Sequence, residues 1–267
     1  MMKEVALEDY KRIPFEILRD VSAFCESNDI RYSLAYGTLL GAIRHKGFIP
    51  WDDDIDVIMP RKDFERFKKT YHSDRFVFSD LSINKNHPTG MAKVYDTKTF
   101  FFYKKTIKRA YGLFIDVFVV DRVPDDNVVF HHWLKRIKRL ITINTAKNTG
   151  LYNIIKSNNS LKWRIKNAAL FFTPLSRAFI QKQIVALQRK YSDTPSSKVG
   201  ITVSVDNPLD TYPSNLFEEY IYVEFEGCMF SAIKDYDKWL SVCYGDYMKL
   251  PPPEKRIGKH NIVAYYR

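Results

Sequence analysis

The residues of this chain best suited to chemistry are two aspartates, Asp54 and Asp56, separated by one isoleucine. They stand at the start of a predicted strand, 55–59, and side chains two positions apart in a strand point to the same face. Two carboxylates held so close repel one another unless a cation lies between them. Mg²⁺ is commonly held by one or two carboxylates together with substrate phosphates. The pair therefore predicts a site for one or two Mg²⁺ ions that acts on a phosphate-containing substrate.

This acidic stretch has three other interpretations: an EF-hand loop, a plain acidic loop and the Asp-x-Asp motif of glycosyltransferases. An EF-hand loop beginning at Asp52 is excluded, because its sixth position would be Val57 instead of Gly and its twelfth Asp63 instead of Glu. A plain acidic loop without a metal remains open. So does the Asp-x-Asp motif of glycosyltransferases, which holds a metal against a nucleotide-sugar.

Further polar residues precede and follow the pair. Gly37 and Thr38 stand between a predicted strand, 31–35, and a predicted helix, 38–45. A Gly there lets the backbone approach a phosphate, the helix N-terminus offers free N–H groups, and the Thr38 hydroxyl can cap the helix.

Asp116 is the third carboxylate of interest, because it lies inside a strongly apolar strand predicted at 111–120. A lone carboxylate in such a strand is costly without a partner, and a metal shared with Asp54 and Asp56 would be one. A surface position on an edge strand is the alternative. The order of Gly-Thr, Asp-x-Asp and a later apolar strand with one Asp is typical of the polymerase-beta-like nucleotidyltransferase fold.

The elements that must position these residues follow from the hydropathy pattern. Helices are predicted at 7–28, 38–45 and 62–70, and strands at 31–35, 55–59, 75–78, 91–95, 99–103, 111–120, 199–203 and 220–230. The tail from Pro251 is predicted to be irregular. This order predicts an α+β fold with a mixed sheet, and its three parts are a catalytic core (1–125), a basic helical segment (126–195) and a C-terminal part that returns to the core (196–267).

Composition limits the class of protein. With 267 residues, 45% of them apolar and 15% aromatic, the chain can fold around a substantial core. Three widely spaced cysteines fit neither a zinc site nor a disulfide framework, which favours a reducing compartment. The sequence lacks an apolar run of about 18 residues and begins with a polar stretch, so we expect a cytoplasmic protein. It has no Walker A or Gly-x-Gly-x-x-Gly motif, so ATP-driven and NAD chemistry have no support.

The net charge of +11 is concentrated in one segment. Residues 127–192 contain 13 Lys or Arg and no Asp or Glu, whereas the remaining 29 basic and 31 acidic residues sum to −2. Phe130, Trp133 and Ile137 recur at helical spacing, and Pro174 is expected to kink or split the helical region. Two interpretations stay open: helices packed on a core with a solvated basic face, or contact with an anionic membrane, weakened by salt. Nucleic acid is the least favoured partner, and we expect none.

The sequence around the acidic pair resembles the LicD family of phosphocholine transferases, which is related to fukutin-type ribitol-phosphate transferases. The resemblance rests on Tyr-Gly-Thr-Leu-Leu-Gly-Ala-Ile-Arg-His at 36–45, Gly-Phe-Ile-Pro-Trp-Asp-Asp-Asp-Ile-Asp-Val at 47–57 and Met-Pro-Arg at 59–61. Tyr-Gly-Asp-Tyr at 244–247 and Leu-Pro-Pro-Pro-Glu-Lys-Arg at 250–256 extend it to nearly the whole chain. The zinc-binding insertion of the fukutin-related branch has no counterpart among the cysteines.

The resemblance implies a metal triad of Asp54, Asp56 and Asp116, with Asp116 as general base for the attacking hydroxyl. It implies that phosphocholine moves from CDP-choline to a hydroxyl of a lipid-linked glycan precursor, of the teichoic-acid or lipopolysaccharide type, as CMP leaves. The expected location is the inner face of a bacterial membrane. The alternatives are another CDP-alcohol as donor (ribitol, glycerol or ethanolamine) or a metal-dependent glycosyltransferase.

The same resemblance suggests further substrate-binding residues. The cations expected to neutralise donor phosphates are Arg44, Lys46, Arg61 and Lys93. Aromatic rings hold quaternary ammonium groups through cation–π contacts, and the candidates for choline are Trp51, Tyr36, Tyr95 and Tyr111. The C-terminal part is expected to close the donor site through Lys255, Arg256 and His260.

Overall fold

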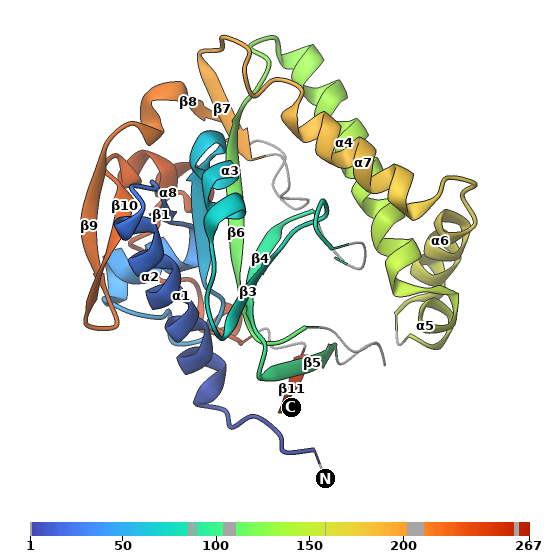
Figure 1. Cartoon of the computed structure of the whole chain (residues 1–267), viewed down its shortest axis with the longest axis horizontal. Coiled ribbons are helices and arrows are strands. Elements are labelled where there is room, and N and C mark those ends of the chain that lie inside the picture. Colours follow the sequence, from blue (N-terminus) through green and yellow to red (C-terminus); the bar gives the residue numbers. More distant parts are fainter. Residues whose placement is uncertain are drawn as a thin grey trace.

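The computed structural model describes residues 2–84, 87, 90–103, 111–157, 159–201, 211–258 and 262–267. They form a mixed sheet with helices packed around it, which confirms the expected α+β class (Figure 1). The helices are α1 (Asp9–Ser27), α2 (Tyr36–His45), α3 (Arg61–Thr70), α4 (Asn127–Thr149), α5 (Leu151–Lys156), α6 (Leu161–Phe171), α7 (Arg177–Arg189) and α8 (Tyr236–Tyr244). The strands are β1 (Ser33–Leu34), β2 (Asp56–Pro60), β3 (Phe76–Ser79), β4 (Ala92–Asp96), β5 (Thr99–Tyr103), β6 (Phe114–Arg122), β7 (Lys198–Ile201), β8 (Thr211–Pro213), β9 (Tyr220–Phe225), β10 (Cys228–Ile233) and β11 (Ile262–Tyr266).

The central strand of the main sheet is β6. In the part of the chain that the structure describes, the strand order is β1-β2-β6-β4-β3, with β7 beside β6 and β8 beside β7. β2 and β6 run parallel, and the other pairs are antiparallel. One edge of β6 pairs with β2, while its other edge pairs first with β4 and then with β7. Its apolar residues from Val117 to Val120 are buried, as expected for a strand covered on both faces.

One large hydrophobic cluster joins the sheet to α1, α2, α3, α8 and the β9–β10 hairpin. α1 contributes a stripe at helical spacing, formed by Ile13, Ile17, Leu18 and Val21, and each of these side chains is fully buried. Figure 1 shows α1, α2, α8 and the hairpin on one side of the sheet and α4 to α7 on the other. The cluster therefore fixes α2 and β2, which carry most of the predicted site.

The basic segment folds into a helical unit, α4 to α7, with its own core. Apolar side chains of α4, among them Trp133 and Ile137, pack against Ile180 and Ile184 of α7. The Trp133 indole N–H donates to the Leu187 carbonyl over 2.9 Å. For the apolar stripe of α4, the interpretation as a core-packed helix is therefore correct. No helix in the described residues is both long and apolar enough to cross a bilayer.

The fold differs from the sequence-based expectation in four places. The tail predicted to be irregular contains β11, which pairs antiparallel with β5. The predicted strand 220–230 is a hairpin that turns at Glu226 and Gly227, where φ is 50° and 73°, as a tight hairpin turn requires. The sequence analysis did not predict α8, and α2 begins at Tyr36 instead of Thr38. Pro174 separates α6 from α7, as predicted.

Candidate active site

The parallel pairing of β2 with β6 brings the predicted carboxylates onto neighbouring strands. Asp56, the first residue of β2, is the register partner of Asp116 on β6. Asp54 lies two residues before Asp56, in the loop that enters β2. Register partners on adjacent strands point to the same side of a sheet, so Asp56 and Asp116 lie side by side. The structure thus brings together the three residues that the Asp-x-Asp pattern and the apolar strand had singled out.

Burial and the neighbouring carboxylates raise the pKa values of Asp54 and Asp56. Burial of the Asp54 carboxylate, followed by repulsion from Asp53, Asp52 and Asp116, raises the pKa of Asp54 to about 7. Part of the Asp54 side chain nevertheless remains exposed to solvent. Dehydration and repulsion from Asp116 and Asp54 raise the pKa of Asp56 well above its ordinary value. A cation among these groups would relieve the repulsion and favour their ionised forms.

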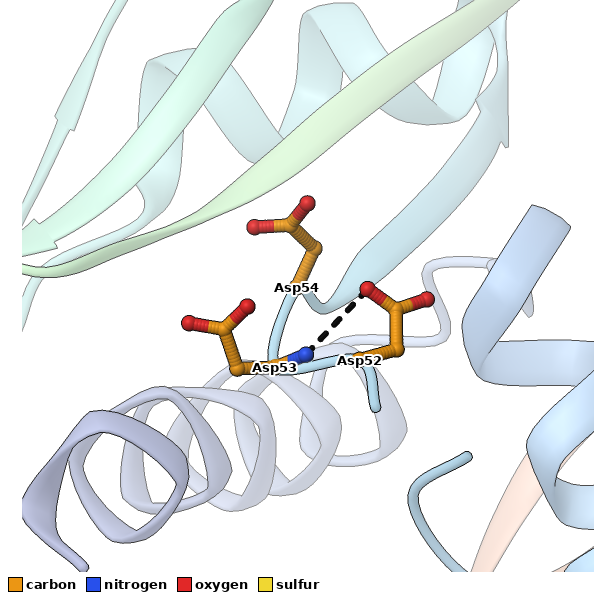
Figure 2. A group of neighbouring side chains, drawn as sticks. All are labelled: Asp52, Asp53 and Asp54. Carbon is orange, nitrogen blue, oxygen red and sulfur yellow. Dashed lines mark hydrogen bonds between the residues drawn. The ribbon is translucent and has the colours of Figure 1, made fainter. Parts of the chain in front are cut away.

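The loop before β2 gathers acidic groups more tightly still. Ligand oxygens of Asp52, Asp53 and Asp54 all lie within 4.8 Å of one another, the one such group of three in the described residues. Figure 2 shows these three carboxylates directed to the same side of the loop, with the Asp53 N–H donating to Asp52 Oδ1 over 3.2 Å. The sequence analysis gave Asp52 and Asp53 no role, although three consecutive aspartates were the signal for one. Asp54 belongs to both groups and connects them.

Asp116 has a partner within the protein, Lys93. β4 runs antiparallel to β6 with Lys93 opposite Asp116, and the Lys93 ammonium contacts Asp116 Oδ1. The same ammonium lies 3.6 Å from the centroid of the Phe114 ring, and only 2% of Lys93 is exposed. The sequence analysis paired Asp116 with a metal and Lys93 with a phosphate. The structure pairs them with each other, because a buried ammonium needs an anion within contact distance.

Gly37 and Thr38 lie in the first turn of α2 and contact the acidic loop and the start of β2. Thr38 Oγ1 accepts a hydrogen bond of 2.8 Å from the Asp56 N–H, and Thr38 is 2% exposed. The expectation that Thr38 caps the helix was wrong: the N-cap is Ala35, and the Thr38 hydroxyl instead holds the start of β2. A Cβ at Gly37 would lie 2.7 Å from Asp52 Oδ2, so a larger residue at this position would require the Asp52 carboxylate to shift.

A group of cations adjoins the acidic loop at Trp51. The Arg256 guanidinium lies over the Trp51 ring, 5.7 Å from its centroid. Arg44 donates to the Tyr247 carbonyl over 2.6 Å, and dehydration followed by repulsion from Arg256 lowers its pKa. Among the described residues, neither Arg44 nor Arg256 forms an ion pair with a carboxylate. Two guanidinium groups near one another without an acidic partner form a place where an anion could bind.

The other residues predicted to bind donor phosphates do not all lie beside Arg44 and Arg256. Arg61 lies at the other end of β2 and is engaged by Asp121, over 2.5 and 2.7 Å, and by Glu65. Lys46 and Lys255 are exposed. His260 lies outside the described residues.

The aromatic candidates other than Trp51 are packed against other rings. The Tyr36 ring contacts Phe118 and Trp239 edge to face, with centroids 4.9 and 5.6 Å apart. Tyr95 and Tyr111 stack on each other at 5.1 Å. These contacts make the three tyrosines part of the packing around the site.

The raised pKa values predict a pH dependence of stability in metal-free protein. The folded protein binds protons at Asp54 and Asp56 more tightly than the unfolded chain, where such groups titrate near 3.8. The contribution of these two groups to stability is therefore greatest below that value and falls as the pH rises through about 7. We expect a lower free energy of unfolding at pH 8 than at pH 5.5 in the presence of chelator, measured by urea denaturation. Asp54→Asn should flatten this dependence, and equal slopes in both proteins would contradict the assignment.

A second prediction concerns the ion pair of Lys93 with Asp116. Lys93→Met keeps the length of the side chain but leaves Asp116 beside two other carboxylates without its cation. We expect a loss of about 3 kcal/mol in the free energy of unfolding. Lys62→Met, at an exposed position of α3, is the matched control and should change it by less than about 0.5 kcal/mol. If the two variants were equally stable, the ion pair would have no structural importance.

Comparison with known proteins matches this chain to a family domain and, over its full length, to a relative. The family described as LicD/FKTN/FKRP, nucleotidyltransferase domain, matches residues 29–146, which include Asp54, Asp56, Lys93 and Asp116. The lipopolysaccharide cholinephosphotransferase LicD of Haemophilus influenzae is 34% identical over 271 residues, which cover 99% of each chain. Uncharacterized proteins of Rickettsia typhi and Rickettsia prowazekii are 38% and 41% identical over 55 and 49 residues, covering 21% and 18% of this chain and 18% of each relative. The full-length identity, together with the domain match, shows that this chain belongs to the LicD family.

Proposed function

We propose that the protein transfers phosphocholine from CDP-choline to a hydroxyl of a cell-surface glycan precursor, of the lipopolysaccharide or teichoic-acid type, and releases CMP. The name of its full-length relative supports phosphocholine as the transferred group and lipopolysaccharide as the acceptor. The observation that carries the proposal is the pairing of Asp56 with Asp116 across β2 and β6, with Asp54 alongside. Such an array suits a reaction at a phosphate, in which positioning and charge neutralisation supply most of the catalysis.

We also propose that Asp54, Asp56 and Asp116 hold Mg²⁺. The donor set consists of carboxylate oxygens, which hard divalent cations prefer. Burial, and then repulsion from neighbouring carboxylates, raises the pKa values of Asp54 and Asp56, and a bound cation would favour their ionised forms. When bound, Mg²⁺ supplies positive charge to the donor phosphates and acidity to a nearby hydroxyl.

In the proposed reaction, Asp116 takes the proton of the acceptor hydroxyl. The oxygen attacks the phosphorus next to choline, the bond from that phosphorus to the CMP oxygen breaks, and CMP leaves with the electron pair. Lys93 holds Asp116 in place through their contact, and Thr38 fixes the backbone of Asp56. Arg44 and Arg256 balance the charge of the donor phosphates. The acceptor is expected to be lipid-linked at the inner face of a bacterial membrane.

The donor is tested by measuring CMP release from CDP-choline, CDP-ethanolamine, CDP-glycerol and CDP-ribitol in the presence of glycan acceptor, with Mg²⁺ or with chelator. We expect Mg²⁺-dependent release from CDP-choline. Release from a different CDP-alcohol would keep the carboxylate site and overturn the choline assignment. Turnover of a nucleotide-sugar instead would show a glycosyltransferase.

The role of the carboxylates is tested in the same assay with Asp56→Asn. We expect CMP release to fall by at least about a hundredfold, because the charge that the site presents to the metal and the phosphates is lost. The folded structure should persist, since removing one of several repelling carboxylates relieves strain in the metal-free protein. Activity within a few-fold of the wild type would exclude Asp56 from the reaction.

The two arginines give a separate prediction. Arg44→Gln and Arg256→Gln should each raise KM for the donor about tenfold or more, because each removes a charge-assisted hydrogen bond to phosphate. Lys249→Gln, at an exposed position of the same C-terminal part, is the charge-matched control and should leave KM unchanged. An effect on thermal stability with no change in KM would assign the arginines a structural role only.

A further inference from the structure

α6 packs on the helical unit through side chains such as Leu170, and it leaves a second set of apolar side chains in solvent. Leu161, Ile165 and Phe172 follow one another at helical spacing, and their exposed fractions are 64%, 62% and 68%. On the opposite face, Asn167 is only 8% exposed and donates to the Trp163 carbonyl. A surface helix that uses all of its apolar residues to pack on its own protein leaves polar side chains on its outer face. The stripe therefore faces something other than the core of this chain.

The exposed apolar surface continues onto α5. Tyr152 and Ile155 are 61% and 52% exposed, whereas Ile154 between them is fully buried. α5 and α6 pack together and lie at the end of the helical unit that is farthest from the sheet (Figure 1). We call these two helices, with Phe172, the helical tip. Scattered apolar residues on a surface are ordinary, but a helical stripe continued by a neighbouring helix is a contact surface.

The charge around the helical tip identifies what it contacts. Lys156, Lys162 and Lys166 are exposed and alternate with the apolar side chains. They belong to the segment 127–192, which has 13 Lys or Arg and no acidic residue. Aliphatic and aromatic side chains edged by lysines are what a helix presents to the interface of an anionic bilayer, where the apolar groups enter between headgroups and the ammonium groups remain in water.

We propose that the helical tip docks on the surface of an anionic lipid bilayer, with α6 lying in the interface. This surface is one part of the segment 127–192 that the sequence pattern suggested, and it leaves out the apolar stripe of α4, which packs against α7. Nucleic acid does not fit, since the protruding Ile155, Leu161 and Ile165 can neither stack on bases nor bind phosphates. The proposal is independent of the transfer reaction, so vesicle binding without substrate tests it alone.

The experiment is co-sedimentation of the full chain with phosphatidylcholine vesicles, with and without phosphatidylglycerol, at low and high salt. We expect binding only to the anionic vesicles, weakened by salt. Ile165→Ser combined with Phe172→Ser should reduce the affinity about tenfold or more. Lys162→Gln combined with Lys166→Gln should reduce it about thirtyfold at low salt. All four positions are exposed, so the thermal midpoint of unfolding should not change.

Two matched control variants test whether the contact with the vesicle is made by the helical tip. Met229→Ser with Val242→Ser, and Lys62→Gln with Lys69→Gln, make the same changes at exposed positions away from the helical tip and should leave binding unchanged. The proposal is overturned if the protein ignores anionic vesicles at low salt, or if control and tip variants bind alike. It is also overturned if the only effect of the apolar tip variant is the loss of self-association, measured by light scattering. A further contradicting outcome is that the wild type and the apolar tip variant bind nucleic acid equally well while neither binds vesicles.

Discussion

The mutual repulsion of the carboxylates at the entrance to β2 and β6 is the constraint on which the rest of the site depends. Asp54, Asp56 and Asp116 would separate in a flexible chain, because burial and the neighbouring carboxylates disfavour the ionised forms of Asp54 and Asp56. The parallel register of two buried strands prevents this, since neither strand can shift without exposing its apolar residues. Lys93 offsets part of the charge from the third strand, β4. The hydrophobic core thus stabilises an arrangement that electrostatics alone would break, and the uncompensated charge that remains is what attracts a cation.

The same reasoning explains which parts of the site could be read from the sequence. Asp54 and Asp56 were predictable because their spacing and the strand period fix their relation within a few residues. Asp116 was predictable because a carboxylate in an apolar strand needs a partner. The identity of that partner was not predictable, since Lys93 meets Asp116 only through the register of β4 on β6. The contact that Thr38 makes was not predictable either, because its hydrogen bond to the Asp56 N–H spans 18 residues.

Long-range packing also determines which of the predicted phosphate-binding arginines pair with carboxylates of the protein. Arg44, Arg61 and Arg256 look alike in sequence, yet Arg61 is neutralised by Asp121 and Glu65, while Arg44 and Arg256 come together beside Trp51. The order of elements and the α+β class followed from hydropathy periods, whereas β11 and α8 did not. β11 is a short strand that forms only because β5 offers an edge, and a pairing over more than 150 residues leaves no local pattern.

The charges at the carboxylate site and those on the helical tip act independently, because solvent and salt screen the interaction between them. At physiological ionic strength, the interaction between exposed charges fades over about 8 Å. Lys156, Lys162 and Lys166 lie on the helical tip, at the far end of the helical unit from the sheet, so they contribute little to the field at Asp54 and Asp56. Phosphate near the carboxylates must be balanced locally, by Arg44 and Arg256 and by any bound cation. The positive charge of the helical tip can therefore act only on a partner that touches it, and the exposed apolar stripe of α6 is where such a partner would also bury apolar surface.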